Sequence, residues 1–321
     1  DRGPARGPDP VVVGLIGLAA PTAALTLDAT GALDRPAVQA WCTVLLAITL
    51  QATPFLVLGV VVSGILAAFV PAGAFTALLP RRQVLAVPVA GLSGAVLPGC
   101  ECSSVPVAGR LVDRGVPAAA ALTFLLAAPA INPVVIVATF VAFPGLPEVA
   151  AARFAAGLLA AVAVGLVWTR VRTPVRSRHP SAPTVVRAQR WAVLQQTAAH
   201  DFLHAGGYLV LGAALAATLQ VVVPRSVLDV VAGNEVLAIA ALAVLAVVLS
   251  ICSEADAFVA AGLSQFSLTA RLVFLTVGPM VDVKLVALQV GTFGRAFALR
   301  FAPLAFVCAV GSALLVAAVV L

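Results

Sequence analysis

Long apolar runs separated by short polar interruptions make up most of this chain. Several of these runs reach the roughly 20 residues that a helix needs to cross a lipid bilayer. The pattern therefore predicts an all-α integral membrane protein, a polytopic helical bundle that crosses the membrane several times. The predicted crossings are residues 37–69, 117–143, 149–169, 191–223, 268–293 and 297–320.

Two further apolar stretches, 83–112 and 233–266, are interrupted in the middle and are predicted to be re-entrant or broken-helix hairpins. The first contains "LPGCECSSVPVAGR" and the second contains "ICSEAD". Proline and glycine break a helix, and irregular backbone in the membrane must be buried in protein or line a cavity. Two full crossings per hairpin are disfavoured, because residues 104–112 are too few to span at 1.5 Å per residue.

The composition excludes a soluble globular domain. Hydrophobic residues make up 62% of the chain, charged residues make up 10%, and the mean hydropathy is +1.12. A soluble domain has about 25% charged residues, which it needs to cover its surface. Residues 11–27 follow Arg2 and Arg6 and resemble a signal-peptide core, but we expect them to form a first transmembrane helix.

The sequence repeats internally. At an offset of 150 residues, Cys102-Ser103 aligns with Cys252-Ser253 and Pro129 aligns with Pro279; at the same offset, Asn132 aligns with Asp282. Self-similarity at a fixed offset indicates repeated structural units. The predicted organisation is an N-terminal segment with the first transmembrane helix (1–36), a first half (37–170), a basic loop (171–190) and a second half (191–321).

The basic residues suggest how these halves are oriented. The net charge is +6, and arginines gather at Arg81-Arg82 and between residues 170 and 190. Short basic loops mark the cytoplasmic side of a membrane protein, so nucleic acid is not an expected partner. With these loops inside, the two halves cross the membrane in opposite senses. Inverted repeats with broken helices are typical of secondary transporters, whose binding site lies near the midplane.

Polar and ionisable residues gather at the breaks of both halves. Five ionisable side chains within the membrane are too costly to be accidental and should converge on a hydrated pocket, with Lys284 offsetting one carboxylate. The alternative is a structural ion-pair network that holds the halves together. The candidate substrate-binding residues are Cys100, Glu101, Cys102, Ser103, Asn132, Cys252, Ser253, Glu254, Asp256, Asp282 and Lys284.

The thiols narrow the expected substrate. Thiolate sulfur prefers soft cations and thiophilic metalloids, which makes Cys100, Cys102 and Cys252 candidate ligands, although buried cysteine often only packs. Packing is the better interpretation for Cys42 and Cys308, which lie in plain apolar runs.

Other motifs are weak or missing. His200 and His204 are four residues apart on one helix face, which is a weak signal for a metal site. No P-loop and no H-E-x-x-H motif is present, so an enzyme is not expected and no cofactor is implied.

The stretch "PGCECSSVPVAGRLVDRGVPAAAALTFLLAAPAINPVVI", together with "ICSEADAFVA" and "GPMVDVK", resembles the ArsP-type family of predicted bacterial permeases. The resemblance implies a multi-pass permease of the bacterial inner membrane, in a family that includes exporters of trivalent organoarsenicals. It implies that Cys100, Cys102 and Cys252 face the substrate.

Three functions follow as expectations. The first is export of a thiophilic metalloid, and the second is transport of zinc or another divalent metal. The third is a non-transporting scaffold subunit of a larger complex. Besides the lipid bilayer, the expected partners are the small solute and a second copy or an accessory membrane subunit.

Overall fold

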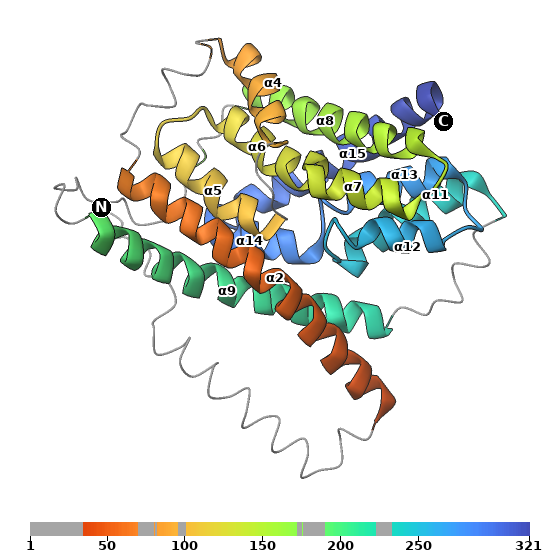
Figure 1. The fold of residues 1–321 in the computed structure, drawn as a ribbon, viewed down its shortest axis with the longest axis horizontal. Helices are drawn as coiled ribbons and strands as arrows, with labels where there is room; N and C mark the ends of the chain where they lie inside the picture. The colour runs from red at the N-terminus through yellow and green to blue at the C-terminus, as the bar shows by residue number, and fades with distance from the viewer. Residues whose placement is uncertain are drawn as a thin grey trace.

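A computed structural model describes residues 35–69, 82–95, 101–171, 190–222 and 233–321, together with residues 80 and 175 (Figure 1). All regular structure in these ranges is helical, and no strand occurs among them. The predicted helix at 11–27 lies outside the described residues, as do Cys100 and most of the basic loop.

Twelve helices are present in the described ranges. The first half contains α2 (Pro36–Phe69), α4 (Gln83–Ser93), α5 (Glu101–Asp113), α6 (Ala118–Ile131), α7 (Pro133–Ala142) and α8 (Pro147–Arg170). The second half contains α9 (Arg190–Val222), α11 (Glu235–Leu249), α12 (Asp256–Gly262), α13 (Leu268–Val277), α14 (Val283–Phe293) and α15 (Arg295–Val320).

Five helical segments are long and apolar enough to cross a bilayer. They are Pro36–Leu66, Ala118–Ala142, Pro147–Arg170, Leu194–Val221 and Arg295–Val320. Large apolar side chains project from these segments into the surroundings instead of packing inside, among them Leu50, Leu299 and Val319. Such a surface is compatible with lipid but not with water. The prediction of an all-α membrane protein is confirmed.

The first predicted hairpin is seen as two short helices, α4 and α5. With 11 and 13 residues, they are about 16 and 20 Å long at 1.5 Å per residue, too short to cross the ~30 Å hydrocarbon core. Ala86 at the start of α4 packs in one cluster with Val116, which follows the end of α5. The hairpin therefore begins and ends at the same end of the bundle, as a re-entrant hairpin does.

The second hairpin also consists of short helices, the 15-residue α11 and the seven-residue α12. The interruption between them begins at Ser250, whose backbone is left-handed with φ 47°. The serine hydroxyl accepts a hydrogen bond from the backbone N–H of Val283 at 3.1 Å. The end of α11 is thereby tied to the start of α14.

Two of the predicted crossings, 117–143 and 268–293, are interrupted at equivalent positions of the two halves, and only the first is among the five segments long enough to cross. Helices α6 and α7 meet at Asn132, and α13 and α14 are separated by residues 278–282. Both α7 and α14 begin with an N-cap: Val135 N–H donates to Asn132 Oδ1 at 3.0 Å, and Leu285 N–H donates to Asp282 Oδ1 at 2.5 Å. Asn132 and Asp282, which the sequence repeat aligns, therefore both cap the N-terminus of the helix that follows them.

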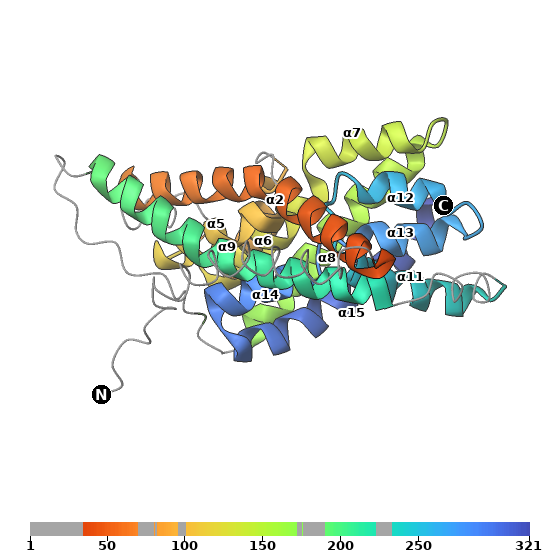
Figure 2. The ribbon, with the colours of Figure 1, turned by 90° about the horizontal axis from the view of Figure 1, so that it is seen from below.

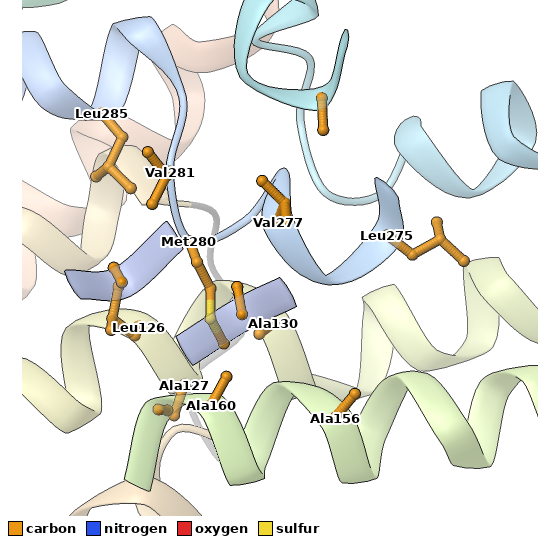
Figure 3. Packing of buried hydrophobic residues seen from close by; sticks show 14 of the residues in the cluster. Leu126, Ala127, Ala130, Ala156, Ala160, Leu275, Val277, Met280, Val281 and Leu285 are labelled. Atoms are coloured by element: carbon orange, nitrogen blue, oxygen red, sulfur yellow. The ribbon is translucent and has the colours of Figure 1, made fainter. Parts of the chain in front are cut away.

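The segment 278–282 is held in place by the core. The side chain of Met280 points towards the small residues Ala127 and Ala130 of α6 and Ala160 of α8 (Figure 3). All four residues are at most 2% exposed. Small side chains allow close helix packing in membranes, where association depends on van der Waals contact. The break between α13 and α14 is therefore wedged against the first half.

Helices α2 and α9 pack side by side (Figure 2). The start of a shorter helix lies close to the backbone of each of them. A Cβ at Gly59 of α2 would lie 2.5 Å from Ser103 Cα, at the start of α5. A Cβ at Gly212 of α9 would lie 2.8 Å from Lys284 Cα, at the start of α14. Upstream of the breaks the repeat continues at an offset of 153 residues, which aligns Gly59 with Gly212. Each of these glycines leaves room for the start of a half-helix.

Contacts between the halves are reciprocal. Helix α5 packs against α14, and α12 packs against α7. In the predicted repeat α5 corresponds to α12 and α14 to α7, so the two contacts are the same contact with the halves exchanged. This exchange agrees with a pseudo-twofold arrangement. The boundaries of the halves and their inverted sense in the membrane remain predictions.

Candidate substrate-binding site

Glu101 and Lys284 form a buried ion pair at the centre of the candidate site. Glu101 is the first residue of α5 and Lys284 lies in the first turn of α14, and both residues are fully buried. Lys284 Nζ donates a hydrogen bond to Glu101 Oε1. The pair joins two residues 183 positions apart in the chain. As predicted, Lys284 offsets a carboxylate, and the structure identifies that carboxylate as Glu101.

Asp282 adds a second carboxylate to this pair. Its Oδ1 caps α14, and its Oδ2 lies 3.6 Å from Lys284 Nζ. Glu101 and Asp282 each lie at the N-terminal end of a helix of at least 11 residues, α5 and α14. The positive end of a helix dipole favours a carboxylate there. Charge is therefore concentrated where broken helices begin, an arrangement that is common in secondary transporters.

The thiols of Cys102 and Cys252 belong to the same neighbourhood. Both cysteines are buried and neither forms a disulfide. Both interact electrostatically with Lys284. One thiol comes from the first hairpin and the other from the second, so the structure brings together residues that the sequence repeat paired. Cys100 lies outside the described residues.

Ser253 and Glu254, which follow Cys252, carry polar atoms without a hydrogen-bond partner among the described residues. These atoms are Ser253 Oγ and Glu254 Oε2, and Glu101 Oε2 shares this state. Buried polar atoms are usually paired, and an unpaired atom calls for an explanation. Unpaired oxygens at the meeting point of two hairpins are what a site for a polar or charged solute would contain.

Asn132 and Ser103, two other predicted site residues, are both buried. Asn132 serves the backbone on both sides of its break, since its Nδ2 donates to the Ala128 carbonyl at 3.1 Å and its Oδ1 caps α7. Ser103 lies where α5 approaches Gly59 of α2. These contacts give both residues a role in building the break and the helix start.

Asp256 has a partner that the sequence did not suggest. Arg153 of α8 donates from Nη2 to both carboxylate oxygens of Asp256, at 2.8 and 2.9 Å. The same guanidinium donates to the Ser253 carbonyl at 2.9 Å and to Thr139 Oγ1 at 2.8 Å. Arg153 is a lone charge in an apolar run, which is the signal that could have identified it.

A second unpredicted pair joins α5 to α9. Arg110 donates from Nη2 to both carboxylate oxygens of Asp201 at 3.0 Å, and both side chains are buried. Ser63 of α2 donates to Asp201 Oδ2 at 3.0 Å. Within "HDFLH", the aspartate between the histidines is therefore the buried, paired residue.

The histidines and the metal hypothesis gain no direct evidence. His200 is exposed and its ring lies 6.1 Å from that of His204, which in turn lies 5.4 Å from Tyr208. Among the described residues, no three His, Cys, Asp or Glu side chains gather closely enough to hold a metal ion. Because Cys100 is not described, coordination by the three cysteines remains a prediction.

Comparison with known proteins gives a family and two relatives. The family ArsP_1, described as predicted permeases, matches residues 38–320. The chain is 33% identical to the "UPF0718 protein YcgR" of Bacillus subtilis, over 79% of this chain and 89% of that protein. It is 30% identical to a Streptococcus mutans protein named "Putative two-component membrane permease complex subunit", over 80% of this chain and 88% of that protein. No solved structure matches the chain.

Proposed function

Because the chain belongs to the ArsP-type family of predicted permeases, we propose that it is a secondary transporter of the bacterial inner membrane that exports a small thiophilic solute. The favoured substrate is a trivalent organoarsenical or a related metalloid species. Cys102 and Cys252, together with Cys100, are proposed to coordinate it. Ser103, Asn132, Ser253 and Glu254 are proposed to build and line the pocket.

One observation carries this proposal: two buried thiols, one from each hairpin, share the electrostatic neighbourhood of a single buried ammonium group, Lys284. A cation beside a thiol favours the thiolate, which is the form that binds soft metals and metalloids. A site divided between two halves can release its ligand when the halves move apart.

The balance of charge favours a second candidate, a divalent cation such as zinc. Lys284 interacts with three acidic groups, Glu101, Asp282 and Glu254. With all three ionised, the neighbourhood has an excess of negative charge, which attracts a cation. The same carboxylates are candidates for carrying protons in exchange for the solute. If transport continues at an unchanged rate after the proton gradient is collapsed, this coupling is excluded.

An accessory subunit is the third candidate. The S. mutans relative is named as a subunit of a two-component membrane permease complex. By analogy, this chain is proposed to act together with a second membrane protein. Purification in mild detergent tests this: a partner recovered in fixed ratio supports it, and full transport by the purified chain alone in liposomes excludes a requirement for it.

The central experiment measures cellular arsenic and zinc by elemental mass spectrometry in an efflux-deficient host. Cells expressing the chain are exposed to trivalent methylarsenical or to zinc. We expect lower arsenic than in the empty-vector control. Cys102→Ser and Cys252→Ser should each lose this effect, because removing one ligand weakens soft-metal binding by about tenfold or more.

Cys308→Ser is the matched control, since Cys308 lies in α15 and has no proposed role. It should export as well as the unchanged protein. A lower cellular zinc content with an unchanged arsenic content would mean that the substrate is a divalent metal and not a metalloid. Equal arsenic and zinc in all cells would overturn the proposal of a thiol-guided exporter.

A further inference from the structure

Three buried ion pairs connect the two parts of the chain. They are Glu101–Lys284, Arg110–Asp201 and Arg153–Asp256, and each joins a residue before position 170 to one after position 190. The first pair belongs to the candidate site. The other two have no part in binding as proposed above, and their positions suggest a different task.

The Arg110–Asp201 pair lies at the end of the bundle where the first hairpin begins and ends. Arg110 is nine residues after Glu101 on α5, so it lies about 13 Å further along the helix. The start of α4 packs there against Val116. Gly165, near the end of α8, also lies close to Val87 of α4. By the positive-inside rule, the arginines at the start of α4 and the end of α8 mark this end as cytoplasmic.

The Arg153–Asp256 pair lies towards the other end. Arg153 is close to the start of α8, and Asp256 begins α12, which packs against α7. Figures 1 and 2 both place α5 and α12 towards opposite ends of the molecule. Asp256 Oδ2 also lies 3.4 Å from the position that a Cβ at Gly278 would take, at the break before α14. The pair thus ties α8 to the second hairpin on the outer side of the candidate site.

Buried ion pairs suit contacts that must open and close. In the closed state each charge is neutralised by its partner, and the pair contributes little net stability compared with apolar packing. When the halves separate, both charges become hydrated, so opening is not heavily penalised. A single charge left buried without its partner is much more costly. Removing one partner should therefore shift the pair towards its open, hydrated state.

We propose that Arg110–Asp201 and Arg153–Asp256 are the cytoplasmic and outer latches of an alternating-access cycle, which open in turn on either side of the Glu101–Lys284 site. This inference rests on the proposed transport function. In the structure described here both latches are closed, and Glu101, Cys102, Asp282 and Lys284 are buried. The structure therefore corresponds to a state in which these residues are closed off from both sides.

The test measures access to the site, not transport. Cys102 is kept as the reporter and the other four cysteines are replaced by alanine. Its reaction with a membrane-impermeant thiol reagent is measured in membrane vesicles of both orientations. Asp201→Asn should speed labelling from the cytoplasmic side by about tenfold or more, because the labelling rate follows the open population. Asp256→Asn should do the same from the outer side only.

Asp113→Asn is the matched control, because Asp113 contacts the same Arg110 at 3.7 Å but is exposed to solvent. It should label like the parent. If either buried variant fails to fold, Arg110→Lys and Arg153→Lys are used, since lysine keeps the charge and loses the fork that contacts both carboxylate oxygens.

The proposal of two latches would be overturned if Asp201→Asn and Asp256→Asn were both labelled faster from the same side. It would also be overturned if both were labelled at the parent's rate. The result is independent of the proposed solute. Side-specific labelling in a protein that moves neither arsenic nor zinc would support the latches and reject the solute. Confirmed export with unchanged labelling would support the solute and reject the latches.

Discussion

Lys284 is the residue on which the candidate site depends most directly, because it is buried between Glu101 and Asp282. Lys284→Met removes the cation and leaves two carboxylates buried together. Breaking a buried pair from one side typically costs about 3–5 kcal/mol. We expect a clear fall in the melting temperature of the purified protein in detergent, together with loss of export.

The double variant Glu101→Leu/Lys284→Met separates stability from function. Replacing both partners of a buried pair by apolar residues is often neutral, so much of the melting temperature should return. Export should stay absent, because the charge beside the thiols is missing. Restored export in the double variant would mean that the pair only holds the fold together, which is the structural alternative raised by the sequence.

At the residue scale, the sequence identified the clustered groups and missed the isolated ones. Glu101, Cys102 and Lys284 lie in short motifs that contain proline and glycine, and Cys252 lies in a short polar stretch within an apolar run, so the local pattern drew attention to all four. Arg153 has its partner 103 positions away. A pattern read along one chain does not contain such a pairing, because only the fold brings the two residues together. The usable signal was an unexplained charge in an apolar run.

At the element scale, Asp282 has two roles that one pair of variants can separate. Its Oδ1 caps α14, and its Oδ2 lies near Lys284. Asp282→Asn keeps a cap acceptor and removes the charge, whereas Asp282→Ala removes both. Losing an N-cap costs about 0.5–2 kcal/mol.

The expected order of melting temperatures is therefore unchanged protein, then Asp282→Asn, then Asp282→Ala. The measurement is a thermal unfolding curve of each purified variant in the same detergent. Equal values for the two variants would show that the cap contributes nothing measurable and that only the charge matters.

The approach of α5 to α2 gives a sharper test of how the elements are packed. A Cβ at Gly59 would lie 2.5 Å from Ser103 Cα, a backbone atom that cannot move alone. Gly59→Val should force α5 away from α2 and displace Glu101 from Lys284. Overpacking costs typically about 1–3 kcal/mol, so we expect reduced folded protein in membranes and loss of export.

Gly207→Ala is the control for this substitution, because a Cβ at Gly207 of α9 meets nothing within 4 Å among the described residues. Alanine is the better helix former, so this variant should be neutral or slightly more stable. Fluorescence-detected size-exclusion profiles compare the two. A normal profile and normal export for Gly59→Val would contradict the close packing of α2 and α5.

The elements themselves could be predicted in large part. Apolar run lengths gave the long helices, and proline and glycine gave the interruptions at α4–α5 and α6–α7. Gly59 and Gly212 align at an offset of 153 residues, but the sequence did not show what they do, because a glycine in an apolar helix can have several roles. The backbone segment that packs against such a glycine is decided by tertiary packing, and the sequence around the glycine does not contain that information.

At the scale of the whole molecule, the same cross-contact occurs twice with the halves exchanged: α5 on α14 and α12 on α7. All three buried ion pairs described above also join the halves, in addition to the apolar packing of α2 on α9 and of α8 on α15. An arrangement in which the two halves meet through exchanged contacts and neutralised charges is suited to a movement of one half against the other.

This arrangement predicts a definite orientation in the membrane. The start of α4 and the end of α8 share one end of the bundle, with Arg82 and Arg170 beside them, and this end should be cytoplasmic. The turn after α7 and the connection between α12 and α13 should face outward.

Single cysteines at three exposed positions, Gln83, Pro144 and Gln265, test this orientation in a protein whose own cysteines have been replaced. In intact spheroplasts an impermeant thiol reagent should label Pro144→Cys and Gln265→Cys, whereas Gln83→Cys should react only after permeabilisation. Labelling of Gln83→Cys in intact spheroplasts would reverse the orientation and exchange the cytoplasmic and outer latches, and protection of Gln265→Cys alone would mean that the second hairpin does not open outward.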